Sequence, residues 1–188
     1  MDNRSNILSC ALQLFTSRGY DPVSVQEIVE AAGITKPTLY HYFGSKHGLL
    51  DTLLGENFTP LFTSIGKAAT YHGDLPLTLN QTATAYFRFA KEHKQFYRMA
   101  LSMWFAPANS VAFQAVSRLN EKQQQILEEL FILAAKDHGN MKGRQRAYAA
   151  TFLGMLNTYI GLSLNGYTQL DDELVYKAIH QFMHGIFS

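Results

Sequence analysis

The sequence predicts an all-α protein of about nine helices, with a small helix-turn-helix domain first and a larger helical bundle after it. Three observations lead to this fold class. Apolar residues recur with the helical period of 3.6 and not with the period of 2 that strands require. Glycine, proline and asparagine cluster at only a few places along the 188 residues. A capping box, a glycine and then a proline follow one another within residues 24–37, which indicates two short consecutive helices.

The first predicted helix covers residues 3–18 and ends at Gly19, which can close a helix. The turn Tyr20-Asp21-Pro22 follows, because proline cannot continue a helix. We expect the buried stripe of this helix to consist of Ile7, Leu8, Ala11, Leu12 and Phe15.

Two short helices joined by a turn give the strongest local signal in the chain. Ser24 and Glu27 stand three residues apart and make a capping box, which starts the first of them. Gly33 occupies the position where a left-handed residue ends a helix at no Cβ penalty. Thr35 can cap the second helix, and Pro37 falls in its first turn, where a missing N–H costs little.

A fourth helix should begin at Ser45, which can cap it. We expect Pro60 to kink or end this helix, because proline clashes with the carbonyl four residues back. Its apolar residues include Leu49, Leu50, Leu53 and Leu54.

The rest of the chain is divided by sparse turn signals, and no internal repeat is visible. The spacing predicts further helices at about residues 76–92, 94–105, 109–136, 142–164 and 171–187. We therefore expect residues 1–48 to form the helix-turn-helix domain and residues 49–188 to form the helical body.

Composition limits the possible classes of protein. A hydrophobic content of 47% is ample for a core, and the single cysteine excludes an internal disulfide framework. No apolar run reaches the ~18 residues of a membrane span, and the N-terminus lacks a secretory signal, so we expect a soluble cytoplasmic protein. The net charge of +1 is low for a nucleic-acid-binding protein. Between Thr35 and Lys46 there is no acidic residue, however, so positive potential is concentrated there.

The first fifty residues resemble the N-terminal domain of the TetR (tetracycline-repressor-like) family of transcriptional regulators. The resemblance is carried by Gly19-Tyr20, Ser24-Val25, Ile28, Ala32-Gly33, the run Thr35-Lys36-Pro37-Thr38-Leu39-Tyr40-His41-Tyr42-Phe43, Ser45-Lys46 and Leu49-Leu50. The sequence departs from the family at Gly48, where an acidic residue would complete a second capping box. We therefore expect a looser start for the fourth helix.

The resemblance implies a DNA-binding domain in which the second helix of the motif enters the major groove. Ser24 and Lys46 are expected to contact phosphates, whereas Leu39 and Phe43 face the domain core. The expected groove-facing residues are Thr35, Lys36, Pro37, Thr38, Tyr40, His41 and Tyr42. Among these, His41 can equally be a solvated surface histidine. The family further implies a homodimer that binds a palindromic operator in double-stranded DNA, most often as a repressor released by a small-molecule effector.

The helical body should hold the effector and the dimer interface. Apolar pockets with few polar groups are the usual ligand sites, although each aromatic residue taken singly is better explained by core packing. The candidate effector-binding residues are Phe58, Phe62, Tyr86, Phe89, Phe96, Tyr97, Met103, Trp104, Phe113, Tyr148, Phe152, Met155 and Tyr159. Small and apolar residues at helical spacing let another helix approach closely. The candidate dimer-interface residues are Thr151, Gly154, Thr158, Gly161, Val175, Ala178, Ile179, Phe182 and Ile186.

Other functions remain open on the sequence. The body can bind a protein partner in place of a small molecule, and a basic run around His93 can either attract an anionic ligand or be a solvated face. An enzyme is disfavoured because we find no nucleophile triad, zinc-binding helix or phosphate-cradling glycine loop. We expect no cofactor and no metal. The leading interpretation is a ligand-responsive transcriptional repressor with a small, largely apolar or aromatic effector.

Overall fold

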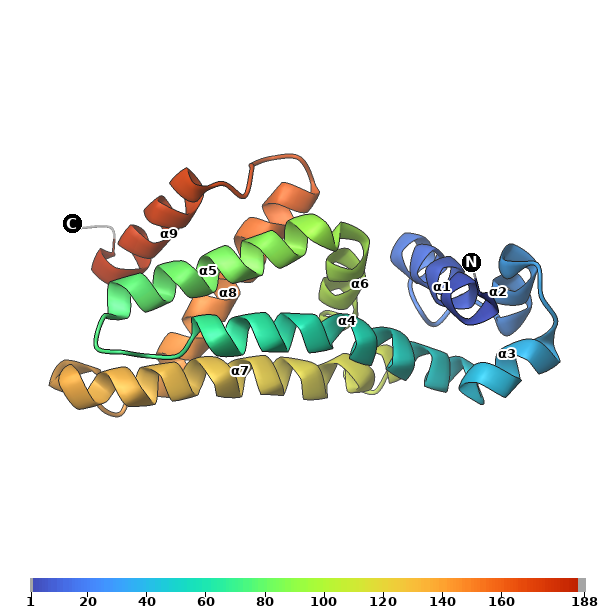
Figure 1. The fold of residues 1–188 in the computed structure, drawn as a ribbon, viewed down its shortest axis with the longest axis horizontal. Coiled ribbons are helices and arrows are strands. Elements are labelled where there is room, and N and C mark those ends of the chain that lie inside the picture. Colours follow the sequence, from blue (N-terminus) through green and yellow to red (C-terminus); the bar gives the residue numbers. More distant parts are fainter. Residues whose placement is uncertain (1, 186–188) are drawn as a thin grey trace. The chain divides into compact units, whose positions relative to one another are not determined.

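The computed structural model describes residues 2–185 of the chain and contains only helices within that range (Figure 1). This confirms the all-α prediction. The described elements are α1 (Asn3–Arg18), α2 (Val25–Ala32), α3 (Lys36–Phe43), α4 (Lys46–Ala68), α5 (Leu75–Glu92), α6 (Lys94–Trp104), α7 (Val111–Asp137), the 3₁₀ helix η1 (Gly139–Met141), α8 (Gln145–Leu164) and α9 (Asp172–His184). None of these helices combines the length and the apolar character that crossing a bilayer would require.

The chain is organised as two compact units that share its two longest helices. The N-terminal unit contains the residues up to Thr59 together with Lys94–Leu119. The C-terminal unit contains Pro60–His93 and the residues from Asn120 onward. Thus α4 contributes its first part to one unit and its second part to the other, and so does α7.

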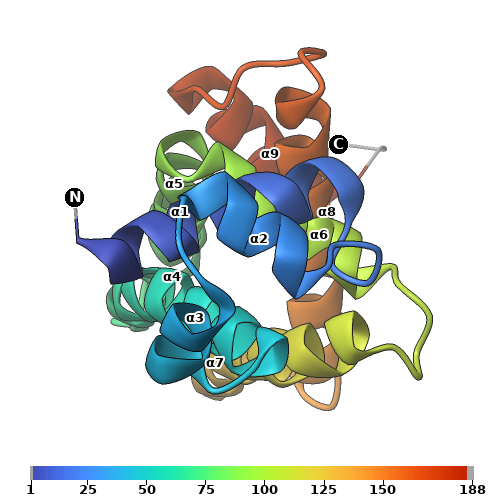
Figure 2. The same cartoon turned by 90° about the vertical axis from the view of Figure 1, so that its right-hand side faces the viewer.

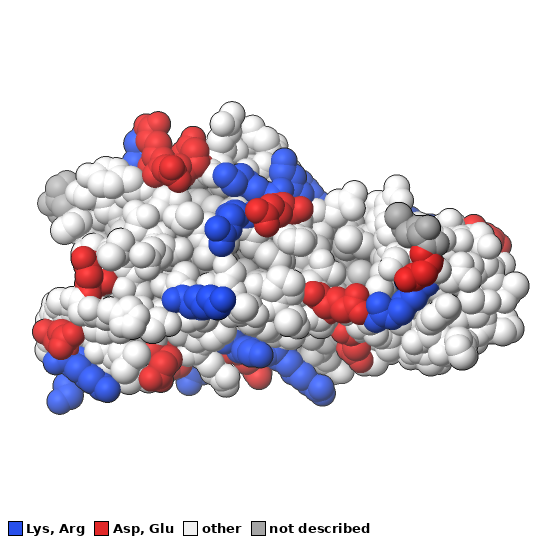
Figure 3. Space-filling view, viewed as in Figure 1, with Lys and Arg blue, Asp and Glu red and all other residues white. Residues whose placement is uncertain are grey.

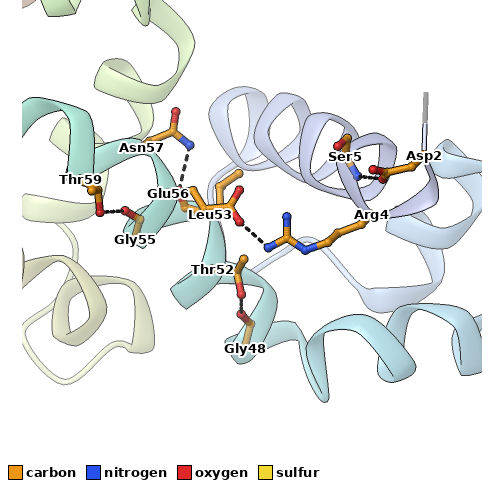
Figure 4. A network of polar contacts seen from close by, with 10 residues as sticks. All are labelled: Asp2, Arg4, Ser5, Gly48, Thr52, Leu53, Gly55, Glu56, Asn57 and Thr59. Carbon is orange, nitrogen blue, oxygen red and sulfur yellow. Dashed lines mark hydrogen bonds and ion pairs between the residues drawn. The ribbon is translucent and has the colours of Figure 1, made fainter.

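In the N-terminal unit, α1 packs against both α2 and α6, and α2 contacts α3 (Figure 2). Ile7, Phe15, Ile28 and Leu39 are completely buried there, so the apolar stripes recognised in the sequence do form this core. A polar contact ties the start of α1 to the first part of α4, because the Arg4 guanidinium forms an ion pair with Glu56 (Figure 4).

Local capping explains where the first helices begin and end. The Asp2 carboxylate accepts a hydrogen bond of 2.7 Å from the Ser5 N–H and starts α1. The predicted capping box at α2 is present in both directions, and Gly33 closes that helix with φ 65°. Thr35 begins α3 but does not cap it as predicted: its hydroxyl lies 3.0 Å from the Thr38 hydroxyl and makes no capping bond.

The start of α4 corrects the expectation drawn from Gly48. The Ser45 hydroxyl accepts a bond of 2.9 Å from the Gly48 N–H, so the helix is capped although no acidic residue stands there. A Cβ atom on residue 48 would lie 2.1 Å from the carbonyl oxygen of Phe43. The tight turn between α3 and α4 therefore requires glycine, which has no Cβ to clash.

Of the two effects predicted for Pro60, a kink or the end of α4, the second is wrong, because the helix continues to Ala68. An internal proline costs about 3 kcal/mol through its lost N–H and its clash with the preceding turn. The turns that follow bury Leu61 and Ile65 completely. Burying two such side chains contributes roughly 3–6 kcal/mol, which offsets the cost of the proline.

In the C-terminal unit, α5 packs against α8 and α9. The observed bounds of α5, α6, α7 and α8 differ from the predicted ranges by no more than three residues at either end, and the predicted end of the last helix at residue 187 lies outside the described residues. No helix was predicted at η1, because three residues carry no periodic signal.

Candidate functional site

Two buried side chains anchor α3, the second helix of the motif, and most of its other side chains are exposed. Leu39 is 0% exposed and Phe43 is 8% exposed, and both face the domain core as predicted. With 100° between successive residues, Pro37 and His41 lie on the side opposite Leu39. Both are exposed. The side of α3 that points away from the core is therefore exposed.

The flanks of α3 carry the remaining candidate residues. Lys36 and Tyr40 lie on one flank, with Tyr40 46% exposed, and Thr38 and Tyr42 lie on the other, with Tyr42 42% exposed. The groove-facing candidates on α3 thus occupy its outer side and both of its flanks, and Thr35 is exposed just before the helix. The hydroxyl groups, the ammonium and the imidazole on this surface can donate hydrogen bonds to bases or phosphates.

Ser24 is already engaged at the start of α2. Its backbone N–H donates to Glu27 Oε2 at 2.8 Å, and its hydroxyl accepts from the Glu27 N–H at 3.2 Å. The bond from the Ser24 N–H, followed by the one from Arg18, lowers the pKa of the Glu27 carboxyl from 4.5 to about 2. Because the backbone N–H of Ser24 is engaged by Glu27, the hydroxyl proton of Ser24 is its remaining donor for the expected phosphate contact.

Lys46 lies against the turn that leads into α2. Its ammonium donates to the carbonyl oxygen of Asp21 at 3.2 Å and sits 4.1 Å from the centre of the Tyr20 ring. Burial lowers the pKa of Lys46, and the charges of Asp21 and Glu27 oppose this shift. Sequence reasoning did not foresee that Tyr20 holds Lys46, although the Gly19-Tyr20 pair was part of the resemblance.

The aromatic candidates for effector binding separate into the two units. In the N-terminal unit, Phe58 packs edge-on against Phe96 with their ring centres 5.1 Å apart, and Trp104 stacks on Phe113 with their ring centres 5.4 Å apart. Tyr97 and Met103 are buried in the same unit, and burial strongly raises the pKa of Tyr97. In the C-terminal unit, the Lys122 ammonium lies 4.5 Å from the centre of the Phe62 ring. The buried candidates there are Tyr86, Phe89 and Phe152.

Three further candidates meet in one surface hollow of the C-terminal unit. This α8–α9 hollow has a volume of about 500 Å³ and is lined by Tyr148, Thr151, Met155, Thr158, Tyr159, Gln181 and Phe182. A second hollow, of about 310 Å³, lies by the start of α5 and the end of α9. It is lined by Leu75, Pro76, Leu79, Phe131, His138, Asn140, Met141, Tyr148, Phe182 and Met183. Tyr148 and Phe182 stand between the two hollows because they line both.

The dimer candidates do not share one environment. Thr151, Gly154 and Thr158 form an exposed stripe on α8, and Gly161 at its end is half-buried. On α9, Val175, Ala178 and Ile179 are buried inside the protomer, where α9 packs on α5. Phe182 is half-buried, and Ile186 lies outside the described residues.

A capped helix, a glycine turn and a second helix with an exposed polar surface define a helix-turn-helix DNA-binding protein. Residues 7–53, which contain this motif, match the family model described as "Bacterial regulatory proteins, tetR family". Residues 7–53 therefore resemble the DNA-binding domain of this family of transcriptional regulators. The relatives and structural neighbours that follow are transcriptional regulators and not enzymes.

Relatives extend the similarity beyond the motif. The transcriptional activator FasR of Mycolicibacterium smegmatis is 25% identical over 98% of this chain and 82% of its own length. The regulator YuxN of Bacillus subtilis is 33% identical over 63% of this chain, but over only 41% of its own length.

Solved structures share the fold over the whole chain. The fatty acid degradation regulator FadR from Bacillus halodurans has a TM-score of 0.80 at 18% identity, covering 100% of this chain and 97% of its own. FadR from Bacillus subtilis, solved in complex with stearoyl-CoA, has a TM-score of 0.79 at 17% identity, covering 97% and 98%.

Proposed function

We propose that this protein is a ligand-responsive repressor that binds a palindromic operator as a homodimer and is released by a small, largely apolar effector. In this proposal, residues 1–48 form the DNA-binding domain, and residues 49–188 bind the effector and form the dimer. The observation that carries this proposal is the exposed surface of α3. Buried Leu39 and Phe43 anchor the helix in the domain core, and no acidic residue stands between Thr35 and Lys46.

The small size of the motif favours DNA binding by a dimer. Each α3 has only eight residues, so one copy reads few base pairs. Two copies held about 34–36 Å apart contact successive major grooves on one face of the duplex. The exposed stripe of Thr151, Gly154 and Thr158 on α8 supports pairing through this helix, because small residues allow helices to approach closely.

A lipid-derived effector is the class that the comparisons favour. One structural neighbour was solved with stearoyl-CoA, and another is a ketosteroid regulator, KstR2 of Mycobacterium tuberculosis. The two hollows of the C-terminal unit are lined largely by aromatic and aliphatic side chains, with Tyr148 common to both. Such walls suit an acyl chain or a fused-ring lipid.

The DNA-binding proposal is tested by titrating the protein onto a selected operator at several salt concentrations. Lys46→Ala should weaken binding to all sequences and flatten the salt dependence by about one unit, because one phosphate contact is lost.

Lys36→Ala should instead reduce the discrimination between bases at one position of each half-site by about 1–3 kcal/mol of binding free energy. Lys136→Ala, in the last turn of α7, is the matched control and should change neither. An unchanged salt slope in Lys46→Ala would remove Lys46 from the phosphate contacts.

The effector proposal is tested by adding long-chain acyl-CoA, free fatty acid or a sterol ketone to the preformed protein–DNA complex. One of these should release the DNA, and Tyr148→Ala should raise the concentration required, because Tyr148 borders both hollows. If none of the three classes releases the DNA, the lipid effector is wrong, and the DNA-binding proposal stands by itself.

A further inference from the structure

Two adjoining hollows lie between the second part of α4 and α5 in the C-terminal unit. The first has a volume of about 390 Å³, and its polar lining consists of Ser64, Lys67, Asn80, Gln81, Thr84 and Arg88. The second, of about 370 Å³, shares Ser64, Ala85 and Arg88 with the first and adds Glu92 and His93. Because they share these residues, the two hollows form one continuous surface feature, which we call the α4–α5 groove.

Small residues contribute to the shape of the groove. Ala68 and Ala85 are part of its lining, and alanine leaves room that a larger side chain would fill. Polar residues recur along the same faces at helical spacing, with Ser64 followed by Lys67 on α4 and Gln81 by Thr84 and Arg88 on α5. Lys67, Gln81 and Arg88 are exposed along these faces, so their polar groups are accessible to a ligand from solvent.

The charge of the groove is positive at one end. Between Asn57 and Lys91 the only acidic residue is Asp74, and its carboxylate is occupied in capping α5, where it accepts a bond of 2.8 Å from the Leu77 N–H. Glu92 lines only the second hollow, so the part that contains Lys67 and Arg88 has no carboxylate in its lining. Figure 3 shows basic side chains in the region of the second part of α4 and of α5, with acidic side chains beside the end of α5.

The donors in the groove are of several kinds. Arg88 Nη2 donates to the Ser64 hydroxyl at 3.3 Å, which orients the guanidinium along the groove. Within the described residues, neither Lys67 nor Arg88 takes part in an ion pair. The Thr84 hydroxyl and the Asn80 and Gln81 amides add neutral donors beside these two cations. Several donors around a concentrated positive charge match the oxygens of a phosphate better than one carboxylate.

We propose that the α4–α5 groove binds a phosphate group, either of a nucleotide-bearing ligand or of free phosphate. Arg88 and Lys67 supply the charge-assisted bonds, and the hydroxyl and amide groups orient the remaining oxygens. The groove consists of residues of the C-terminal unit and includes none of the DNA-binding candidates, and the proposal does not depend on which effector releases the DNA.

The test uses isothermal titration of the full chain at low salt with adenosine 3′,5′-bisphosphate and with inorganic pyrophosphate. Arg88→Gln and Lys67→Gln should each weaken binding about tenfold, because each removes a charged hydrogen bond. Arg88→Lys should lose less than Arg88→Gln, since it keeps the charge and loses only the planar fork. Lys136→Gln is the control for a general loss of positive charge and should bind as the wild type does.

The two probes distinguish the source of the phosphate. Tighter binding of the nucleotide indicates a nucleotide-bearing ligand, and equal binding of the two probes indicates recognition of phosphate alone. The proposal is overturned if the wild type binds neither probe, or if Lys136→Gln weakens binding as much as Arg88→Gln. It is also overturned if Arg88→Gln weakens operator binding and leaves probe binding unchanged. Operator binding by the wild type, measured on the same samples, shows separately whether the regulator function holds.

Discussion

At the scale of single residues, Glu27 links the start of α2 to the end of α1. It accepts from the Ser24 N–H at 2.8 Å and from the Arg18 guanidinium at 2.6 Å. Both bonds require the ionised carboxylate, which is why its pKa falls to about 2. Because α2 contacts α3, the charge of the Glu27 side chain affects the stability of the helix-turn-helix motif.

We expect Glu27→Gln to remove a pH-dependent part of the stability. A lowered folded-state pKa stabilises the fold above the ordinary value of 4.5, and this contribution is lost as the pH falls towards about 2. The wild type should therefore be more stable than Glu27→Gln at neutral pH, and the difference should shrink between pH 4.5 and 2. Urea unfolding across this range measures it, with the exposed Glu129→Gln as control. A difference that stays constant with pH would contradict the assignment.

At the scale of elements, the beginning of α4 depends on a glycine within a helix. Glycine ordinarily weakens a helix relative to alanine by roughly 0.5–1 kcal/mol. At Gly48, however, the carbonyl oxygen of Phe43 occupies the space that a Cβ atom would need. At Gly55, seven residues later in the same helix, a Cβ atom would meet nothing within 4 Å.

The two glycines should therefore respond in opposite ways to alanine. Gly48→Ala should destabilise the protein by about 1–3 kcal/mol, because the backbone of the α3–α4 turn must shift. Gly55→Ala should stabilise it by about 0.5–1 kcal/mol through helix propensity. Chemical unfolding of both variants gives the comparison, and equal signs would show that the turn does not constrain residue 48.

At the scale of elements, too, the sequence was most informative where structure is local. Caps, glycines and the 3.6-residue period act within one or two turns, so the bounds of α1, α2 and α3 followed directly from the residues. Pro60 shows where such reasoning fails, because the cost of a proline is local but the burial of Leu61 and Ile65 depends on the rest of the fold. For the α4–α5 groove, the sequence indicated only a basic run around His93, and it did not indicate that residues of α4 lie beside it.

At the scale of the whole molecule, the proposed dimer rests on the exposed face of α8. Gly154 is exposed, and a Cβ atom there would meet nothing within 4 Å of its own chain. A large residue at this position therefore costs the protomer little, and it would keep a second copy of α8 at a distance.

We expect Gly154→Arg to shift the protein towards monomer and to weaken binding to a full palindrome more than binding to a half-site. Gly66→Arg is the matched control, because Gly66 is also an exposed helical glycine with nothing within 4 Å of its Cβ position. Sedimentation and DNA titration of the two variants measure the effect. A Gly154→Arg protein that remains fully dimeric would exclude α8 from the centre of the interface.

The sequence by itself determined the helices and the DNA-binding motif, because capping, glycine conformations and apolar periodicity are properties of neighbouring residues. Only the tertiary structure decided what each apolar face meets. The spacing of Val175, Ala178 and Ile179 showed that one side of α9 is buried, and the fold placed that side against α5 of the same chain and left the small residues of α8 exposed. A periodic pattern indicates that one face of a helix is buried, but it does not indicate which partner covers that face.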